Sequence, residues 1–138
     1  MLDRPNAATA ASPKLAPRAE VLDLAHLFRM TLGDHDLERE VLQLFSRQAD
    51  MLITRMPGTV PTGVAAMAHT LKGSARGIGA WRLAQAADAV ELAAAASCHD
   101  PNHGVDHDCG QELTAAIDAL RSAAAATELA IADVLRPR

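Results

Sequence analysis

Four residues in one short stretch of the chain could together act on a phosphoryl group. They are His69, Lys72, Gly73 and Arg76, within the sequence MAHTLKGSARGIGA of residues 67–80. Imidazole is largely neutral at cytoplasmic pH, and the free nitrogen of its neutral form is a nucleophile. A phosphoryl group under attack spreads its charge over three oxygens, which an ammonium one helical turn away can stabilise. The pattern fits a histidine that accepts a phosphoryl group, and it equally fits a solvated histidine beside ordinary surface cations.

A helix is required to hold these side chains together, and the stretch has the periodicity of one. At 100° per residue its apolar side chains share a core-facing stripe of Ala68, Leu71, Ala75 and Ile78. His69 and its polar neighbours centre roughly 130° away from that stripe, so the imidazole should project outward. A glycine inside a helix costs about 1 kcal/mol relative to alanine. Gly73 therefore leaves room either for a partner protein beside the imidazole or for close packing of two helices.

Periodicity and helix-breaking residues predict an all-α fold. The predicted helices cover residues 20–32, 34–56, 64–78, 80–94 and 111–135, and residues 97–110 are expected to form a loop. The apolar stripe of the first helix is Val21, Leu24, Ala25, Phe28 and Leu32, and that of the second is Leu37, Val41, Leu44, Phe45, Gln48, Leu52 and Met56. Residues 1–19, with three prolines, are expected to be a flexible leader. Long helices with short connections predict an up-down antiparallel four-helix bundle with a short additional N-terminal helix, in one domain over residues 20–136.

The composition excludes several classes of function. The apolar residues are mainly Ala and Leu, which favour helices, and the chain has two Phe, one Trp and no Tyr. A formal net charge of −4 argues against a nucleic-acid surface. No apolar run approaches the roughly 20 residues that span a bilayer, and no glycine-rich loop for ATP is present. These features predict a cytoplasmic protein that binds neither nucleic acid nor membrane and does not phosphorylate itself from ATP.

The run AHTLKGSA at residues 68–75, followed by IGA at 78–80, resembles the signature of histidine-containing phosphotransfer (HPt) domains. Further similarities lie outside this run: Leu22-Asp23, the Gly33-Asp34 turn, Leu44-Phe45 with Gln48, Leu83, and Val90-Glu91. The motifs cover residues 20–98, and the similarity of architecture extends to the end of the chain. The resemblance implies a stoichiometric phosphocarrier rather than an enzyme, which relays a phosphoryl group between Asp residues of response-regulator receiver domains in a two-component phosphorelay.

The same resemblance assigns roles to individual residues. His69 would accept the phosphoryl group through its Nε2 atom, Lys72 would stabilise that group electrostatically, and Gly73 would leave space for the receiver's active site. Partner binding is expected from three further residues, Gln48, Arg76 and Gly77. Gln48 would hydrogen-bond near the imidazole, although a plain polar surface role is equally compatible with its type. Gly77 departs from the family pattern and is expected to fray the end of its helix.

The resemblance also implies the partners of the chain. They are response-regulator receiver domains and an upstream hybrid histidine kinase. The Mg²⁺ needed for transfer is expected on the receiver, with neither cofactor nor metal on this chain. Because four long helices can close a core within one chain, a monomer is expected.

Three alternative interpretations remain open from the sequence. A helical interaction bundle could have the fold without phosphotransfer. A histidine-kinase dimerisation domain usually has an acidic residue after its histidine, where this chain has Thr70. A metal-binding loop at residues 98–109 could use His99, His103 and His107 with Cys98 and Cys109 as zinc ligands, although a hydrophilic loop is the simpler interpretation. A disulfide between those two cysteines is disfavoured by a reducing cytoplasm.

Overall fold

The protein is described by a computed structural model that covers residues 21–98 and 107–137. These residues form a short helix α3 (Leu24–Met30) and four long helices, α4 (His35–Arg55), α5 (Pro61–Ile78), α6 (Trp81–Cys98) and α7 (His107–Leu135). A single 3₁₀ turn, η2 (Met56–Gly58), follows α4. No strand occurs among the described residues, so the predicted all-α class is confirmed for them. The predicted leader lies outside the described residues.

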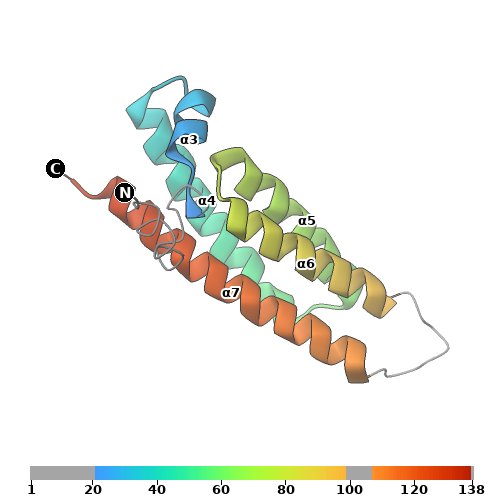
Figure 1. Ribbon diagram of the computed structural model, residues 1–138. Coiled ribbons are helices and arrows are strands. Elements are labelled where there is room, and N and C mark those ends of the chain that lie inside the picture. The colour runs from blue at the N-terminus through green and yellow to red at the C-terminus, as the bar shows by residue number, and fades with distance from the viewer. Residues whose placement is uncertain (1–20, 99–106, 138) are drawn as a thin grey trace, which may run out of the picture.

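The four long helices lie side by side as a bundle, and α3 sits at the end where α5 and α6 meet (Figure 1). Each long helix packs against two others: α4 against α5 and α7, and α6 against α5 and α7. One fully buried leucine from each of the five helices marks the core: Leu27, Leu42, Leu71, Leu83 and Leu120. Burial of a leucine side chain stabilises a fold by about 1.5–3 kcal/mol. The core is therefore continuous through all five helices, α3 included.

The helix ends follow from local chemistry. The Asp34 carboxylate accepts hydrogen bonds from the backbone N–H groups of Asp36 and Leu37, at 3.0 and 3.1 Å, and caps α4. Pro61 occupies the first turn of α5, where its missing N–H costs nothing. Gly79 ends α5 in the left-handed conformation, with φ of +82°. The predicted stop at this glycine is confirmed.

The predicted apolar face is wrong for the first helix and only partly right for the second. In α3 the predicted residues Leu24, Ala25 and Phe28 are exposed, and so is Leu32 just after the helix. The buried residues are Leu27 within α3, Leu22 before it and Thr31 at its C-cap. In α4 the predicted residues Leu37 and Leu44 are exposed, whereas the predicted Phe45, and Met56 just after the helix, are buried. Three buried residues of α4 were not predicted: Leu42, Ala49 and Ile53. Both helices carry apolar residues on more than one side. Periodicity alone therefore could not fix which side the bundle buries.

Two other boundaries also differ from the sequence-based expectation. Helix α6 extends to Cys98 and α7 begins at His107, so helical residues reach into both ends of the segment predicted as a loop. Helix α5 continues unbroken through Gly77 to Ile78, so the expected fraying at Gly77 is absent. The bond from the N–H of Ala80 to the carbonyl oxygen of Ala75, 2.8 Å, closes the end of that helix. This closure holds the last turn in place despite the glycine.

Candidate functional site

The turn between α5 and α6 sets the register of the residues around His69. Only Gly79 and Ala80 separate the two helices, so they form a tight helical hairpin. In such a hairpin, residues equally far from the turn lie opposite one another. His69 and Glu91 are equally far in sequence from Ala80, one before it and one after it, and so are Lys72 and Asp88.

His69 projects outward from α5, as predicted, and its side chain is 68% exposed. Its Nδ1 atom lies 3.0 Å from Oε2 of Glu91 on α6. An ionised carboxylate can only accept a hydrogen bond, so the imidazole donates from Nδ1. The lone pair of the neutral ring then resides on Nε2. Glu91 thereby fixes which ring nitrogen is the nucleophile.

Glu91 is kept ionised by its partners. Its other oxygen, Oε1, lies 2.7 Å from the ammonium nitrogen of Lys72. The hydrogen bond from Lys72, and to a smaller extent the one from His69, holds the pKa of Glu91 below its usual range, against the opposing effect of burial. The carboxylate therefore stays charged at neutral pH and below, which maintains its contact with the imidazole.

Lys72 occupies a different position from the one expected. Its side chain is only 14% exposed, because the ammonium turns toward α6 and not toward solvent. There it contacts Oδ1 of Asp88 at 3.0 Å as well as Glu91. The bonds to Glu91 and Asp88 raise the pKa of Lys72, so the group is a permanent cation. Lys72 is thus close to His69, as predicted, but it is shared by two carboxylates.

The two glycines on this face of α5 leave open space. A Cβ atom at Gly73 or at Gly77 would meet nothing within 4 Å. The interpretation of Gly73 as a contact for close helix packing is therefore wrong. Space for an approaching molecule beside His69 is the explanation that the structure leaves for it.

Gln48 and Gly77 line the same groove, and His69 is not among the residues that line it. Both line a groove between α3, α4 and α5, together with Ser74 and the exposed side chains of Leu37 and Leu44. No hydrogen bond joins Gln48 to His69 within the described chain. Gln48 and Gly77 are therefore placed to contact something seated in the groove, and the predicted hydrogen bond of Gln48 near the imidazole stays a prediction.

Arg76 is exposed on α5 and forms no ion pair within residues 21–98 or 107–137. It lies two helical turns beyond His69, and helical side chains lean toward the N-terminus of their helix. Arg76 therefore lies on the same face of α5 as His69, and its exposed side chain is available to an anionic partner.

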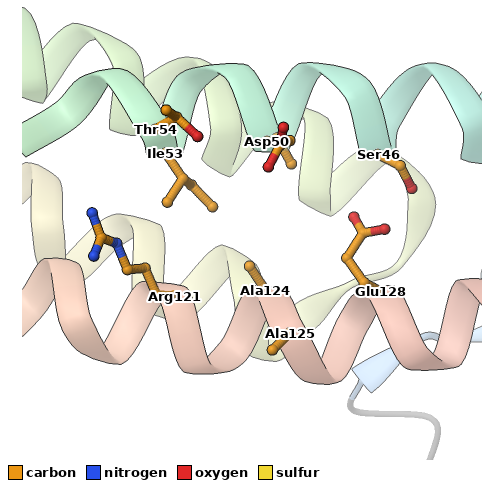
Figure 2. A pocket seen from close by; sticks show the side chains of 9 residues that line it. Ser46, Asp50, Ile53, Thr54, Arg121, Ala124, Ala125 and Glu128 are labelled. Carbon is orange, nitrogen blue, oxygen red and sulfur yellow. The ribbon is translucent and has the colours of Figure 1, made fainter.

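A second groove, between α4 and α7, contains none of the predicted site residues. Figure 2 shows Glu128 extending from α7 toward α4, where Asp50 and Ser46 lie, and Arg121 farther along α7. No hydrogen bond or ion pair joins these side chains among the described residues. The open spacing follows from the small Ala124 side chain between the two helices.

The predicted metal-binding loop falls largely outside the described residues. Within the described part of the chain, no group of three His, Cys, Asp or Glu side chains could hold a metal ion. None of the described helices is both long enough and apolar enough to cross a membrane.

Glu91 is the residue whose role sequence reasoning missed. Its type contributed to the family resemblance, but its contact with His69 did not follow from periodicity. The available signal was the equal spacing of His69 and Glu91 from the turn at Ala80, which pairs them across the hairpin.

Comparison with known families gives one match. A family model described as the Hpt domain matches residues 40–123, which is more than half of the chain and includes α5 and α6 whole. No curated protein and no solved structure matches the chain significantly.

Proposed function

The chain belongs to the Hpt domain family, and we propose that it relays a phosphoryl group between aspartate residues of receiver domains through His69. Histidine phosphotransfer in phosphorelays is the general activity of this family. The observation that carries the specific proposal is the contact between His69 and Glu91, which leaves Nε2 of an exposed imidazole free. Lys72 and Gly73 act beside it as cation and as open space.

The transfer step uses the geometry around His69 directly. The Nε2 lone pair attacks the phosphorus of an aspartyl phosphate, a new N–P bond forms, and the O–P bond to the receiver's carboxylate breaks with its electron pair. The ring becomes an imidazolium that still carries its Nδ1 proton. The Glu91 carboxylate balances that positive charge. Return of the phosphoryl group to a second receiver reverses each step.

The cations on α5 have separate tasks in this proposal. Lys72 has three N–H donors, and contacts to Asp88 and Glu91 occupy two of them. The third can reach an oxygen of the phosphoryl group on His69. Arg76 contacts the receiver, whose active site is acidic. The Mg²⁺ that assists transfer is held by the receiver, and this chain needs no cofactor of its own.

The apolar groove between α3, α4 and α5 is the docking surface of the receiver in this proposal. Its wall includes Met30, Leu37 and Leu44, all exposed, and its floor includes Gly77 on the helix that carries His69. Gln48 supplies a polar contact within it. Such a surface suits a small transient interface, which a shuttle requires because it must release each partner.

The wider organisation is proposed to follow the family. Helices α4 to α7 form the up-down antiparallel four-helix bundle, and α3 is the additional N-terminal helix. The ring of contacts in which each long helix packs against two others supports this arrangement. The domain spans residues 20–136, and the chain acts in the cytoplasm as a monomeric phosphocarrier, downstream of a hybrid histidine kinase and without kinase activity of its own.

The test is phosphoryl transfer from purified receiver domains phosphorylated with acetyl phosphate. We expect acid-labile, base-stable phosphate to appear on the wild-type chain and to be absent from the His69→Gln variant. His69 is exposed, so the substitution should change the free energy of unfolding by no more than about 0.5 kcal/mol. Circular dichroism then shows that the variant is folded. Labelling that persisted in folded His69→Gln would disprove the assignment.

A further inference from the structure

The side chains of His69, Lys72, Asp88 and Glu91 form one cluster of contacts, and the charges within this cluster do not balance. Lys72 contributes one positive charge, and the carboxylates of Asp88 and Glu91 that contact it contribute two negative charges. With a neutral imidazole the cluster has a net charge of −1. A phosphoryl group added to Nε2 brings further negative charge to a site that is already negative.

The two carboxylates differ in what they touch. Glu91 contacts both His69 and Lys72, so it takes part in orienting the imidazole. Asp88 has an ion-pair contact at 3.0 Å with Lys72 and with no other residue of the described chain, and its side chain is 44% exposed. Asp88 therefore adds charge near the phosphoryl position and occupies one donor of the ammonium without holding the ring.

We propose that Asp88 is a positioning residue that raises the free energy of the phosphorylated form of His69, so that the phosphoryl group is passed on and not retained. It acts mainly through Lys72, because it draws the ammonium toward α6. Its own negative charge also repels the phosphoryl oxygens. This inference rests on the proposed phosphoacceptor role of His69. The proposed role of Asp88 affects the equilibrium between phosphorylated and free His69. The position of His69 alone does not determine this equilibrium.

Removal of the Asp88 charge should favour phosphohistidine. In Asp88→Asn the side chain keeps its shape, the cluster becomes neutral, and Lys72 loses one ionic competitor. One charge acting on a phosphoryl group across several ångströms near solvent should change the equilibrium about three- to tenfold. The difference should shrink at high salt, because the site is partly exposed and screened.

The experiment uses phosphoramidate as the phosphoryl donor, because a small donor makes no docking contacts. The N–P bond of phosphoramidate breaks, ammonia leaves, and a new N–P bond forms on Nε2 of His69. The ratio of phosphorylated to free chain is measured by intact-protein mass spectrometry at fixed concentrations of phosphoramidate and ammonia. Labelling of other histidines is subtracted with His69→Gln in each background.

Three variants define the result. We expect Asp88→Asn to raise the phosphorylated-to-free ratio three- to tenfold, and Asp88→Glu to restore the wild-type ratio. Asp118→Asn, which removes the same charge from an exposed position on α7, should leave the ratio unchanged. A ratio that stayed constant or fell in folded Asp88→Asn would overturn the inference. Failure of the proposed function would be seen separately, as wild-type chain that receives no phosphate from receiver domains while its phosphoramidate labelling at His69 still responds to Asp88.

Discussion

Two carboxylates in this bundle, Asp23 and Glu91, each join separate elements, and their surroundings differ. Asp23 lies at the end of the bundle where the turn joins α5 to α6, called the closed end here. There Oδ2 accepts a hydrogen bond from the indole N–H of Trp81 at 3.0 Å, and Oδ1 accepts one from the backbone N–H of His26 at 3.1 Å. Glu91 lies along the side of the bundle, where it contacts Lys72 and His69. In both cases the hydrogen bonds hold the pKa of the carboxyl below its usual range, with Trp81 the main cause for Asp23 and Lys72 for Glu91.

The histidines beside these two carboxylates show what separates structure from chemistry. The His26 ring packs edge-on against Trp81, with ring centroids 5.0 Å apart, and its Nε2 atom is enclosed. The His69 ring has a carboxylate on Nδ1 and solvent around the remainder. A carboxylate between helices therefore contacts an enclosed part of the fold in one place and orients an exposed imidazole, the proposed phosphoacceptor, in the other. The difference lies in whether the second ring nitrogen can be reached.

The largest expected contrast is in phosphoryl acceptance. Glu91→Gln removes the charge that fixes the Nδ1 proton and balances the imidazolium, so the rate of acceptance from a phosphorylated receiver should fall at least about tenfold. Asp23→Asn, the same change at the closed end, should leave that rate unchanged. Both rates are measured by rapid-quench labelling. Equal rates in the two variants would mean that Glu91 has no more than a structural role.

Space beside His69 provides the next contrast. Gly73→Leu should slow transfer from receiver domains by about tenfold or more, because the side chain fills the approach to the imidazole, while helicity is kept since no atom lies within 4 Å of the new Cβ. Gly110→Leu is the matched control, because Gly110 is also helical and open but lies near the start of α7. Transfer at the wild-type rate by Gly73→Leu would remove the clearance explanation.

A glycine lies near each of the two carboxylates, Gly79 beside Asp23 and Gly73 on the face of α5 that carries His69, and alanine should have opposite effects on stability at the two positions. At Gly79, φ is +82° and a Cβ would lie 2.9 Å from the backbone oxygen of Asp23, so Gly79→Ala should lower the free energy of unfolding by about 1–3 kcal/mol. Gly73→Ala should raise it by up to about 1 kcal/mol, because the position is helical and open. Urea denaturation measures both changes. The same sign for both variants would contradict the geometry of the α5–α6 turn.

The smallest expected effect is a dependence of stability on pH. The folded pKa of Asp23 is lowered, so its contribution is present above the ordinary aspartate range and is lost as the pH falls through the folded value. Asp23→Asn should therefore be less stable than the wild type at neutral pH, and the gap should narrow below about pH 4. Thermal melts across that range measure the gap. A gap that stayed constant toward low pH would show that the indole bond does not depend on the charge of Asp23, and a gap that widened would contradict the lowered pKa.

Several features of the site follow from neighbouring residues and could be predicted. The helix through His69, its outward projection and the stop at Gly79 all depend on a 3.6-residue period and on one glycine. The faces of α3 and α4 could not be predicted in the same way. Leu37 and Leu44 fit an inward stripe as well as Leu42 does, and only packing against α5 and α7 decides between them.

The sequence by itself therefore determined an all-helical chain with an exposed His69, because these features depend on local periodicity. It left Gly73 open between space for a partner and close packing of helices, and the structure decided for open space. Only the tertiary structure decided that Lys72 turns away from solvent toward Asp88 and Glu91. It also decided that Glu91 holds the imidazole. These contacts join residues from different helices, so they depend on the rotation and the register of α5 relative to α6. The tight turn between the two helices and the core that they share fix both.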